Sequence, residues 1–345
     1  MLVENFFFLL GAISIFLYGL KILSEGISQV VGGKISALVK GATSNKYGAI
    51  LTGIGATAIA QSSVATNMIV ITFVEKGIIS FVGACAVIMG TNIGTTVTAQ
   101  LVSLSTVSNL NVTAIGSFIA FIGLLLYFCK KQNLKSIGLA ALGFGFIFIG
   151  IELLTKNVEC FEKYAWFTSL FKVKNPLLLL LNGFVITAIL QSSSVASSVM
   201  IVLGSIGLID FKSAMFLILG ANVGTCLPVI FSSLSMGKES IKCSIFNIAF
   251  NIAGVVIFFL PLVFLGDKIA ALSVFSAGIG RSIANFHTLF NVAVTLILTP
   301  MLKYFCKLVD NLYIFLFTEK PKKGVTWRAF KLKFKKILTK TNKIA

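Results

Sequence analysis

The sequence predicts an all-α polytopic membrane protein with inverted-topology repeats, each containing a re-entrant helical hairpin and a discontinuous span. Three observations lead to this fold class: the composition, an internal duplication and an uneven distribution of lysine. Of the 345 residues, 57% are hydrophobic and only 12% are charged, and the mean hydropathy is +0.99. A soluble domain carries about 25% charged residues, so the composition indicates an integral membrane protein.

Long apolar stretches recur along the chain and are candidates for the cores of transmembrane helices. The first stretch has no basic segment before it and no small-residue cleavage site after it, so we expect a span and not a cleaved signal. The clearest stretches are 5–20, 110–129, 137–151, 177–204, 244–266 and 283–302.

An internal duplication relates the two halves of the chain. Residues 57–63 read TAIAQSS, and 130 residues later 187–193 read TAILQSS. The same offset places GTNIGT at 90–95 on GANVGT at 220–225, and 20 of the 53 gapless pairs around both motifs are identical. The best-retained segments are polar and lie inside apolar runs, a pattern typical of binding sites at the membrane midplane.

The segment 48–75 is too short to cross the membrane twice. Its Gln-Ser-Ser motif lies near the centre and leaves two apolar arms of about 12 residues, or about 18 Å of helix. Because a membrane core is about 30 Å thick, we expect a re-entrant hairpin whose tip is buried in protein. The next segment, 78–105, is interrupted at Gly90–Gly94, and we expect one crossing made of two half-helices.

Each half then contains three crossings, so the second half must be inverted relative to the first. A seventh span near 283–303 then brings the chain back to the cytoplasmic side. The predicted regions are 1–136, the first membrane repeat; 137–268, the inverted second repeat; 269–305, the final span region; and 306–345, a basic cytoplasmic tail.

The lysine distribution supports this topology. With the N-terminus outside, 22 Lys and Arg residues fall inside or at inner span ends and 7 outside. The segment 303–345 holds 12 of the 29, which predicts a cytoplasmic C-terminus. Aromatic residues recur among these lysines at helical spacing, so we expect the tail to contact anionic lipid. The net charge of +18 is therefore a membrane signal, and we expect no nucleic acid partner.

The paired Gln-Ser-Ser motifs predict an oxyanion site. An unsatisfied amide in hydrocarbon costs several kcal/mol, so each glutamine needs a partner or a ligand. A helix that starts at each hairpin tip presents free backbone N–H groups and the positive end of its dipole, and serine hydroxyls add donors. The predicted anion-binding residues are Gln61, Ser62, Ser63, Gln191, Ser192, Ser193 and Ser194.

The interrupted spans predict a cation site of neutral oxygens. A break at Asn92–Thr95, and its counterpart at Asn222–Thr225, would expose carbonyl groups beside amide and hydroxyl oxygens, which suit Na⁺. Proton coupling would need a carboxylate or histidine within the membrane, and Glu152 is a candidate. Upstream of the motifs the duplication continues at an offset of 131, which places Lys21 of the first repeat at the position of Glu152. Neither of these two residues therefore belongs to a symmetric site.

Other functions stay open at this stage. The same donors would hold sulfate or a carboxylate, and the coupling ion could be a proton. A channel or exporter would work without sodium. A membrane scaffold or sensor is a further alternative, but its function would not require both polar motifs. An enzyme is not expected, because the chain has one histidine and no nucleophile–base pair.

At these motifs the sequence resembles the Na⁺/phosphate cotransporter family, the type II transporters of animals and their shorter bacterial relatives. Three features carry the resemblance: the paired Gln-Ser-Ser segments, the paired Gly-x-Asn-x-Gly-Thr segments, and ANFHTLFN at 284–291. It covers about residues 5–305. The first motif departs from the family pattern, since Val64 stands where a third serine is usual.

The resemblance implies sodium-driven import of inorganic phosphate by an elevator-like movement of the hairpin-bearing core. It implies no organic cofactor, a homodimer and a bacterial cytoplasmic membrane, in which the charge distribution above places the N-terminus outside. Phosphate would bind the seven Gln and Ser residues named above. Sodium would bind at or beside Gln61 and Gln191, and at Asn92, Thr95, Asn222 and Thr225.

Overall fold

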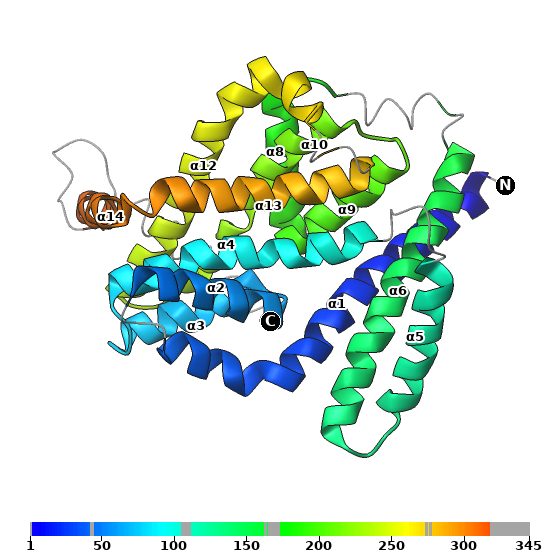
Figure 1. Cartoon of the computed structure of the whole chain (residues 1–345), viewed down its shortest axis with the longest axis horizontal. Coiled ribbons are helices and arrows are strands. Elements are labelled where there is room, and N and C mark those ends of the chain that lie inside the picture. The colour runs from blue at the N-terminus through cyan, green and yellow to red at the C-terminus, as the bar shows by residue number, and fades with distance from the viewer. Residues whose placement is uncertain are drawn as a thin grey trace.

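The computed structural model describes residues 2–41, 45–104, 112–161, 164, 173–272, 275 and 278–317. All regular secondary structure in these residues is helical (Figure 1). Among these residues, five helices are long and apolar enough to cross a membrane, and a bent pair gives a sixth if it is counted as one span. The predicted all-α polytopic membrane fold is therefore confirmed. The five are Glu4–Val30, Phe81–Ser103, Gln132–Val158, Phe211–Ser233 and Lys238–Ala270.

The first half of the chain begins with a helix of 40 residues, longer than a single crossing needs. This helix continues beyond the predicted apolar stretch 5–20 as far as Gly41. The helices of this half are α1 (Leu2–Gly41), α2 (Lys46–Ala60), α3 (Ser63–Glu75), α4 (Phe81–Ser103) and α5 (Val112–Tyr127).

The second half repeats this order and adds two helices. Its helices are α6 (Gln132–Phe161), α8 (Pro176–Leu190), α9 (Ser193–Ser205), α10 (Phe211–Gly224), α11 (Cys226–Ser233) and α12 (Lys238–Ala270). The chain then continues through α13 (Ile279–Leu298) and α14 (Leu302–Phe317). These last two helices meet at an angle of 87°, next to Pro300. Proline lacks the backbone N–H that a continuing helix would use there.

Both predicted hairpins are present as pairs of short helices. Their arms are 15 and 13 residues long in each copy, or about 22 and 20 Å of helix. These arms are shorter than a membrane core of about 30 Å. Re-entry from opposite faces depends on where the bilayer lies, so the inverted topology stays a prediction.

The predicted break in the first copy is not present, because α4 is one continuous helix of 23 residues. The second copy is interrupted at Thr225, between α10 and α11. The cause is Pro228, whose ring excludes the carbonyl group of Gly224 and which has no N–H to donate to it. The first copy has Thr98 at this position, and its helix continues.

The glycines at the predicted helix breaks allow close packing between helices instead. A side chain on Gly90 would overlap the carbonyl oxygen of Ile50 in α2, and one on Gly94 would lie 2.6 Å from that of Ile54. Gly220 and Gly224 meet α8 in the same way. Small residues four apart allow this close approach between membrane helices, so each Gly-x-x-x-Gly holds its span against its own hairpin.

The helices form two groups. Helices α1, α5 and α6 lie together, and the hairpins pack with α4 and α10–α14 beside them (Figure 1). Helices α1 and α6 approach closely because Gly19 meets Gly143 and Ile147, and Gly26 meets Ala140. The second group contains most of the buried aromatic core, formed by Phe216, Phe246, Phe250, Phe286 and Phe290.

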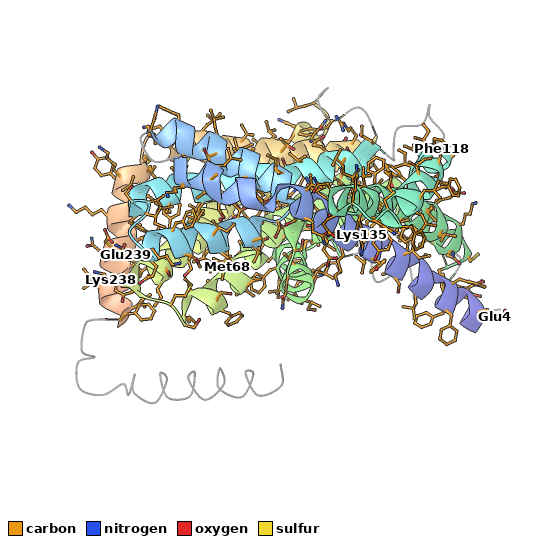
Figure 2. All side chains as sticks on the ribbon, turned by 90° about the horizontal axis from the view of Figure 1, so that it is seen from below. Glu4, Met68, Phe118, Lys135, Lys238 and Glu239 are labelled. Atoms are coloured by element: carbon orange, nitrogen blue, oxygen red, sulfur yellow. The ribbon has the colours of Figure 1, made fainter. Side chains whose placement is uncertain are left out.

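An ion pair and a cation–π contact join helix α14 to the start of α12. The ammonium group of Lys242 lies 2.6 Å from the carboxylate of Asp310 and 2.9 Å from that of Glu239. Lys238 lies over the ring of Tyr313, at 5.7 Å. Figure 2 shows Lys238 and Glu239 beside α14, at the opposite end of the molecule from Glu4. The tail beyond residue 317 lies outside the described residues, so its contact with lipid stays a prediction.

Candidate anion-binding site

Each hairpin turns at its glutamine. Gln61 has φ 51° and Gln191 has φ 55°, and these are the described non-glycine residues with positive φ. The backbone N–H of each glutamine ends the preceding helix by donating to the carbonyl of Thr57 or Thr187, at 2.8 and 2.7 Å. A left-handed backbone costs a non-glycine residue about 1–2 kcal/mol, and such strain is concentrated at functional sites.

The serine after each glutamine begins the returning helix. Ser62 accepts a hydrogen bond from the backbone N–H of Ala65 at 3.2 Å, and Ser192 accepts one from that of Val195 at 3.3 Å. Each capping oxygen is an acceptor, so its hydroxyl proton remains free to donate. The first turn of each helix also presents backbone N–H groups and the positive end of the dipole. The two tips therefore present equivalent capping serines and helix N-termini, which are groups that can donate to an anion.

The two tips meet at one pocket. It has a volume of about 450 Å³, within the usual range of about 300–1,000 Å³ for ligand sites. It brings together four of the predicted anion-binding residues, Gln61, Ser62, Ser192 and Ser194. The full lining is Leu17, Leu20, Lys21, Leu23, Ser24, Glu25, Gln61, Ser62, Thr98, Leu190, Ser192, Ser194 and Val195.

Hydrogen bonds fix the side chain of Gln61 in this pocket. The hydroxyl of Thr98 donates to its Oε1 at 2.6 Å, and its Nε2 donates to the carbonyl of Ala58 at 2.6 Å. The hydroxyl of Ser24 lies 3.5 Å from the Gln61 carbonyl oxygen. An amide nitrogen has two protons, so the second remains available to a ligand.

Gln191 is placed differently from its counterpart. Its side chain is exposed, does not line the pocket and makes no side-chain hydrogen bond within the described residues. Pro228 stands where the first copy has Thr98, so the donor that fixes Gln61 has no equivalent. The two glutamines are equivalent in backbone conformation and different in side-chain environment.

The remaining predicted serines divide between the pocket and the helix interior. Ser63 and Ser193 are the first residues of α3 and α9, and both are buried outside the pocket lining. Ser194 lines the pocket, and its hydroxyl lies 3.4 Å from the carbonyl oxygen of Thr95 in the other copy. Val64 holds the corresponding place in the first hairpin and can donate no such bond.

Of the predicted sodium residues, Gln61 lines the pocket, whereas Asn92, Thr95, Asn222 and Thr225 belong to α4 and the end of α10 and lie outside the lining. The side-chain nitrogens of Asn92 and Asn222 donate to the carbonyls one turn earlier, at 2.9 and 2.8 Å. The hydroxyls of Thr95 and Thr225 do the same, at 2.8 and 2.9 Å. All four retain oxygen lone pairs that can accept a cation, and sodium binding there stays a prediction.

Four polar residues of the pocket lining were not predicted from the sequence. Thr98 has no counterpart in the duplication, and Lys21, Ser24 and Glu25 belong to α1, outside both motifs. One signal was available: two opposite charges one helical turn apart inside an apolar span indicate contact with water or a ligand.

These features together define a polytopic membrane transport protein with one polar site between two helical hairpins. The profile of the Na⁺/Pi-cotransporter family matches the chain over residues 15–156 and 167–297. The chain therefore belongs to this family, which is a family of transporters and not of enzymes.

Three relatives show how the similarity is distributed. YqeW of Bacillus subtilis, to which no function is assigned, is 31% identical over 86% of this chain and 94% of its own length. YjbB of Escherichia coli, named as a candidate inorganic phosphate export protein, is 26% identical over 87% of this chain. Sodium-dependent phosphate transport protein 2A of Rattus norvegicus is 33% identical over 28% of it.

The chain covers 55% of YjbB and 15% of the rat protein. It is therefore a counterpart of part of each of them. No solved structure matches the chain.

Proposed function

We propose that this protein is a secondary active transporter that couples the movement of inorganic phosphate to sodium. The observation that carries the proposal is the single pocket at which Ser62 and Gln61 of one hairpin meet Ser192 and Ser194 of the other. Hydroxyl protons, an amide proton and two helix N-termini converge there, and all of them favour an oxyanion.

The position of the pocket supports an alternating-access mechanism. It lies where α1 meets the two hairpin tips, between the group of α1, α5 and α6 and the rest of the molecule. A movement between these groups would change the side from which the pocket is reached. We place the protein in the bacterial cytoplasmic membrane, with the N-terminus outside, the C-terminus inside and a second copy as its partner.

Sodium as the coupling ion is supported by the family and by the name of the rat relative. Neutral oxygens at Gln61, Gln191, Asn92, Thr95, Asn222 and Thr225 supply ligands that Na⁺ accepts. Phosphate export is the second candidate function, because YjbB is similar over 87% of this chain and is named for export.

Reconstituted proteoliposomes test both directions of transport. Labelled phosphate is followed into and out of vesicles under sodium, potassium or proton gradients, each imposed alone. Uptake that follows the sodium gradient supports the proposal, and efflux without sodium dependence supports the exporter. Gln61→Ala should abolish transport, whereas Gln132→Ala, at an exposed glutamine outside the pocket, should not. No phosphate movement under any gradient would refute both functions.

A further inference from the structure

The pocket between the hairpin tips has a charged wall. Lys21 and Glu25 of α1 line it, and they are the two charged residues of its described lining. Their ammonium and carboxylate groups are 3.7 Å apart, one helical turn from each other. The side chains are 67% and 49% exposed, so both reach open space.

Both charges lie within the candidate membrane span of α1. The span Glu4–Val30 has Leu17 at its middle, which places Lys21 about 6 Å and Glu25 about 12 Å beyond that point. Charged side chains inside a membrane span face a water-filled cavity or a partner, because lipid solvates them poorly. The pocket with the hairpin tips is the cavity that both residues line.

The ion pair between Lys21 and Glu25 is weak enough for Lys21 to change its partner. Ion pairs between exposed side chains contribute little stability, since water solvates both partners well. A lysine side chain is long and flexible, and its ammonium can turn from one acceptor to another. An anion at Ser62 and Ser192 would therefore compete with Glu25 for Lys21.

The duplication does not reproduce this charge. The second copy has Glu152 at the position of Lys21 and Lys156 at that of Glu25, so the order of the charges is reversed. The pair Glu152–Lys156 is also formed, but neither residue lines the pocket. The ammonium in the pocket wall is therefore a contribution of α1 alone.

We propose that Lys21 is the residue that selects the anion by its charge: its ammonium leaves Glu25 and contacts the oxyanion held by the hairpin tips. The inference rests on the proposed phosphate-binding function of this pocket. Hydroxyls, amides and backbone N–H groups bind tetrahedral oxyanions through dipoles and recognise their shape. A full positive charge attracts an anion in proportion to the anion's charge, so Lys21 favours doubly charged over singly charged tetrahedral anions.

Equilibrium binding of labelled phosphate to the purified full-length protein tests the assignment. We expect Lys21→Gln to weaken phosphate binding at least tenfold and Lys21→Arg to retain most of it. Glu25→Gln should tighten binding, because it frees Lys21 and removes a repelling charge. Lys156→Gln is the matched control, since this lysine holds the corresponding ion pair outside the pocket, and it should bind as the original chain does.

Sulfate and perchlorate separate charge from shape, because both are tetrahedral and they differ in charge. In the original chain sulfate should displace labelled phosphate at lower concentration than perchlorate, and Lys21→Gln should reduce this preference at least tenfold. Original affinity in Lys21→Gln, or no preference for sulfate in the original chain, would overturn the assignment while leaving phosphate binding intact. If the original chain binds no phosphate, the proposed function itself fails. If Lys21→Gln does not fold, Glu25→Gln decides, and unchanged or weaker binding contradicts the proposal.

Discussion

The hydroxyl of Thr98 donates a hydrogen bond of 2.6 Å to the side-chain oxygen of Gln61. This bond joins the span of the first copy to the tip of its hairpin and fixes which face of the amide reaches the pocket. In the second copy Pro228 replaces the donor, interrupts the span and leaves the side chain of Gln191 exposed. The difference between Thr98 and Pro228 therefore explains why the side chain of Gln61 is fixed by a hydrogen bond and that of Gln191 is not.

We predict that Thr98→Val weakens phosphate transport without unfolding the protein. A net hydrogen bond contributes about 0.5–1.5 kcal/mol, so the concentration for half-maximal uptake should rise about two- to tenfold. The measurement is the concentration dependence of uptake into proteoliposomes. Thr72→Val is the control, because that hydroxyl donates to the Met68 carbonyl of its own helix and lies outside the pocket lining, so uptake should be unchanged. Equal effects of both substitutions would contradict a positioning role for Thr98.

Gly90→Ala should destabilise the fold. The added methyl group would overlap the Ile50 carbonyl, and such overpacking costs about 1–3 kcal/mol. Gly55→Ala in α2 meets nothing within 4 Å, so the helix propensity of alanine should leave stability equal or higher. Thermal unfolding of both variants in detergent measures the difference. A Gly90→Ala protein as stable as the original would show that the two helices pack less closely than described.

Ser194→Ala should reduce phosphate affinity about two- to tenfold, because it removes a pocket hydroxyl worth one hydrogen bond. Ser197→Ala removes a buried hydroxyl that bonds to the Ser194 carbonyl in the same helix, away from the pocket lining. It should leave affinity unchanged. Labelled phosphate binding distinguishes the two variants, and a larger loss in Ser197→Ala would place the anion elsewhere.

The inverted topology predicts that the two hairpins enter the membrane from opposite sides, so that the ends of their helices away from the tips lie on opposite sides. Lys76 and Ser205 are exposed and lie at the ends of α3 and α9. Cys129 and Cys160 are partly exposed, so both are first replaced by serine, while the four other cysteines are buried. With an impermeant thiol reagent on intact cells, Ser205→Cys should react and Lys76→Cys should not. Labelling of both from one side would exclude the inversion.

The sequence was sufficient to predict the hairpins, because a polar motif in the middle of a 28-residue apolar segment leaves arms too short to cross. It also predicted the meeting of Gln61, Ser62, Ser192 and Ser194, because duplicated polar motifs inside a membrane need a common polar surrounding. Both inferences depend on segment length and on repetition, which a sequence displays directly.

The continuous helix at Gly90–Gly94 could not be predicted in the same way. A glycine in a membrane span can either interrupt the helix or allow close contact with a neighbouring helix. Only the position of α2 shows that Gly90 and Gly94 allow close contact. The absence of Gln191 from the pocket lining could not be predicted either, because it depends on Pro228, a proline 37 residues later in the chain. Lys21 and Glu25 reach the pocket because α1 passes the hairpin tips, a contact between elements that no local pattern contains.

We propose that the two hairpin tips, one from each copy, bind a single phosphate together. Equilibrium binding of labelled phosphate to the original protein, to Ser62→Ala and to Ser192→Ala tests this most directly. We predict one phosphate per chain in the original protein and a loss of affinity of about two- to tenfold or more in each variant. Two phosphates per chain, or original affinity in either variant, would contradict a shared site.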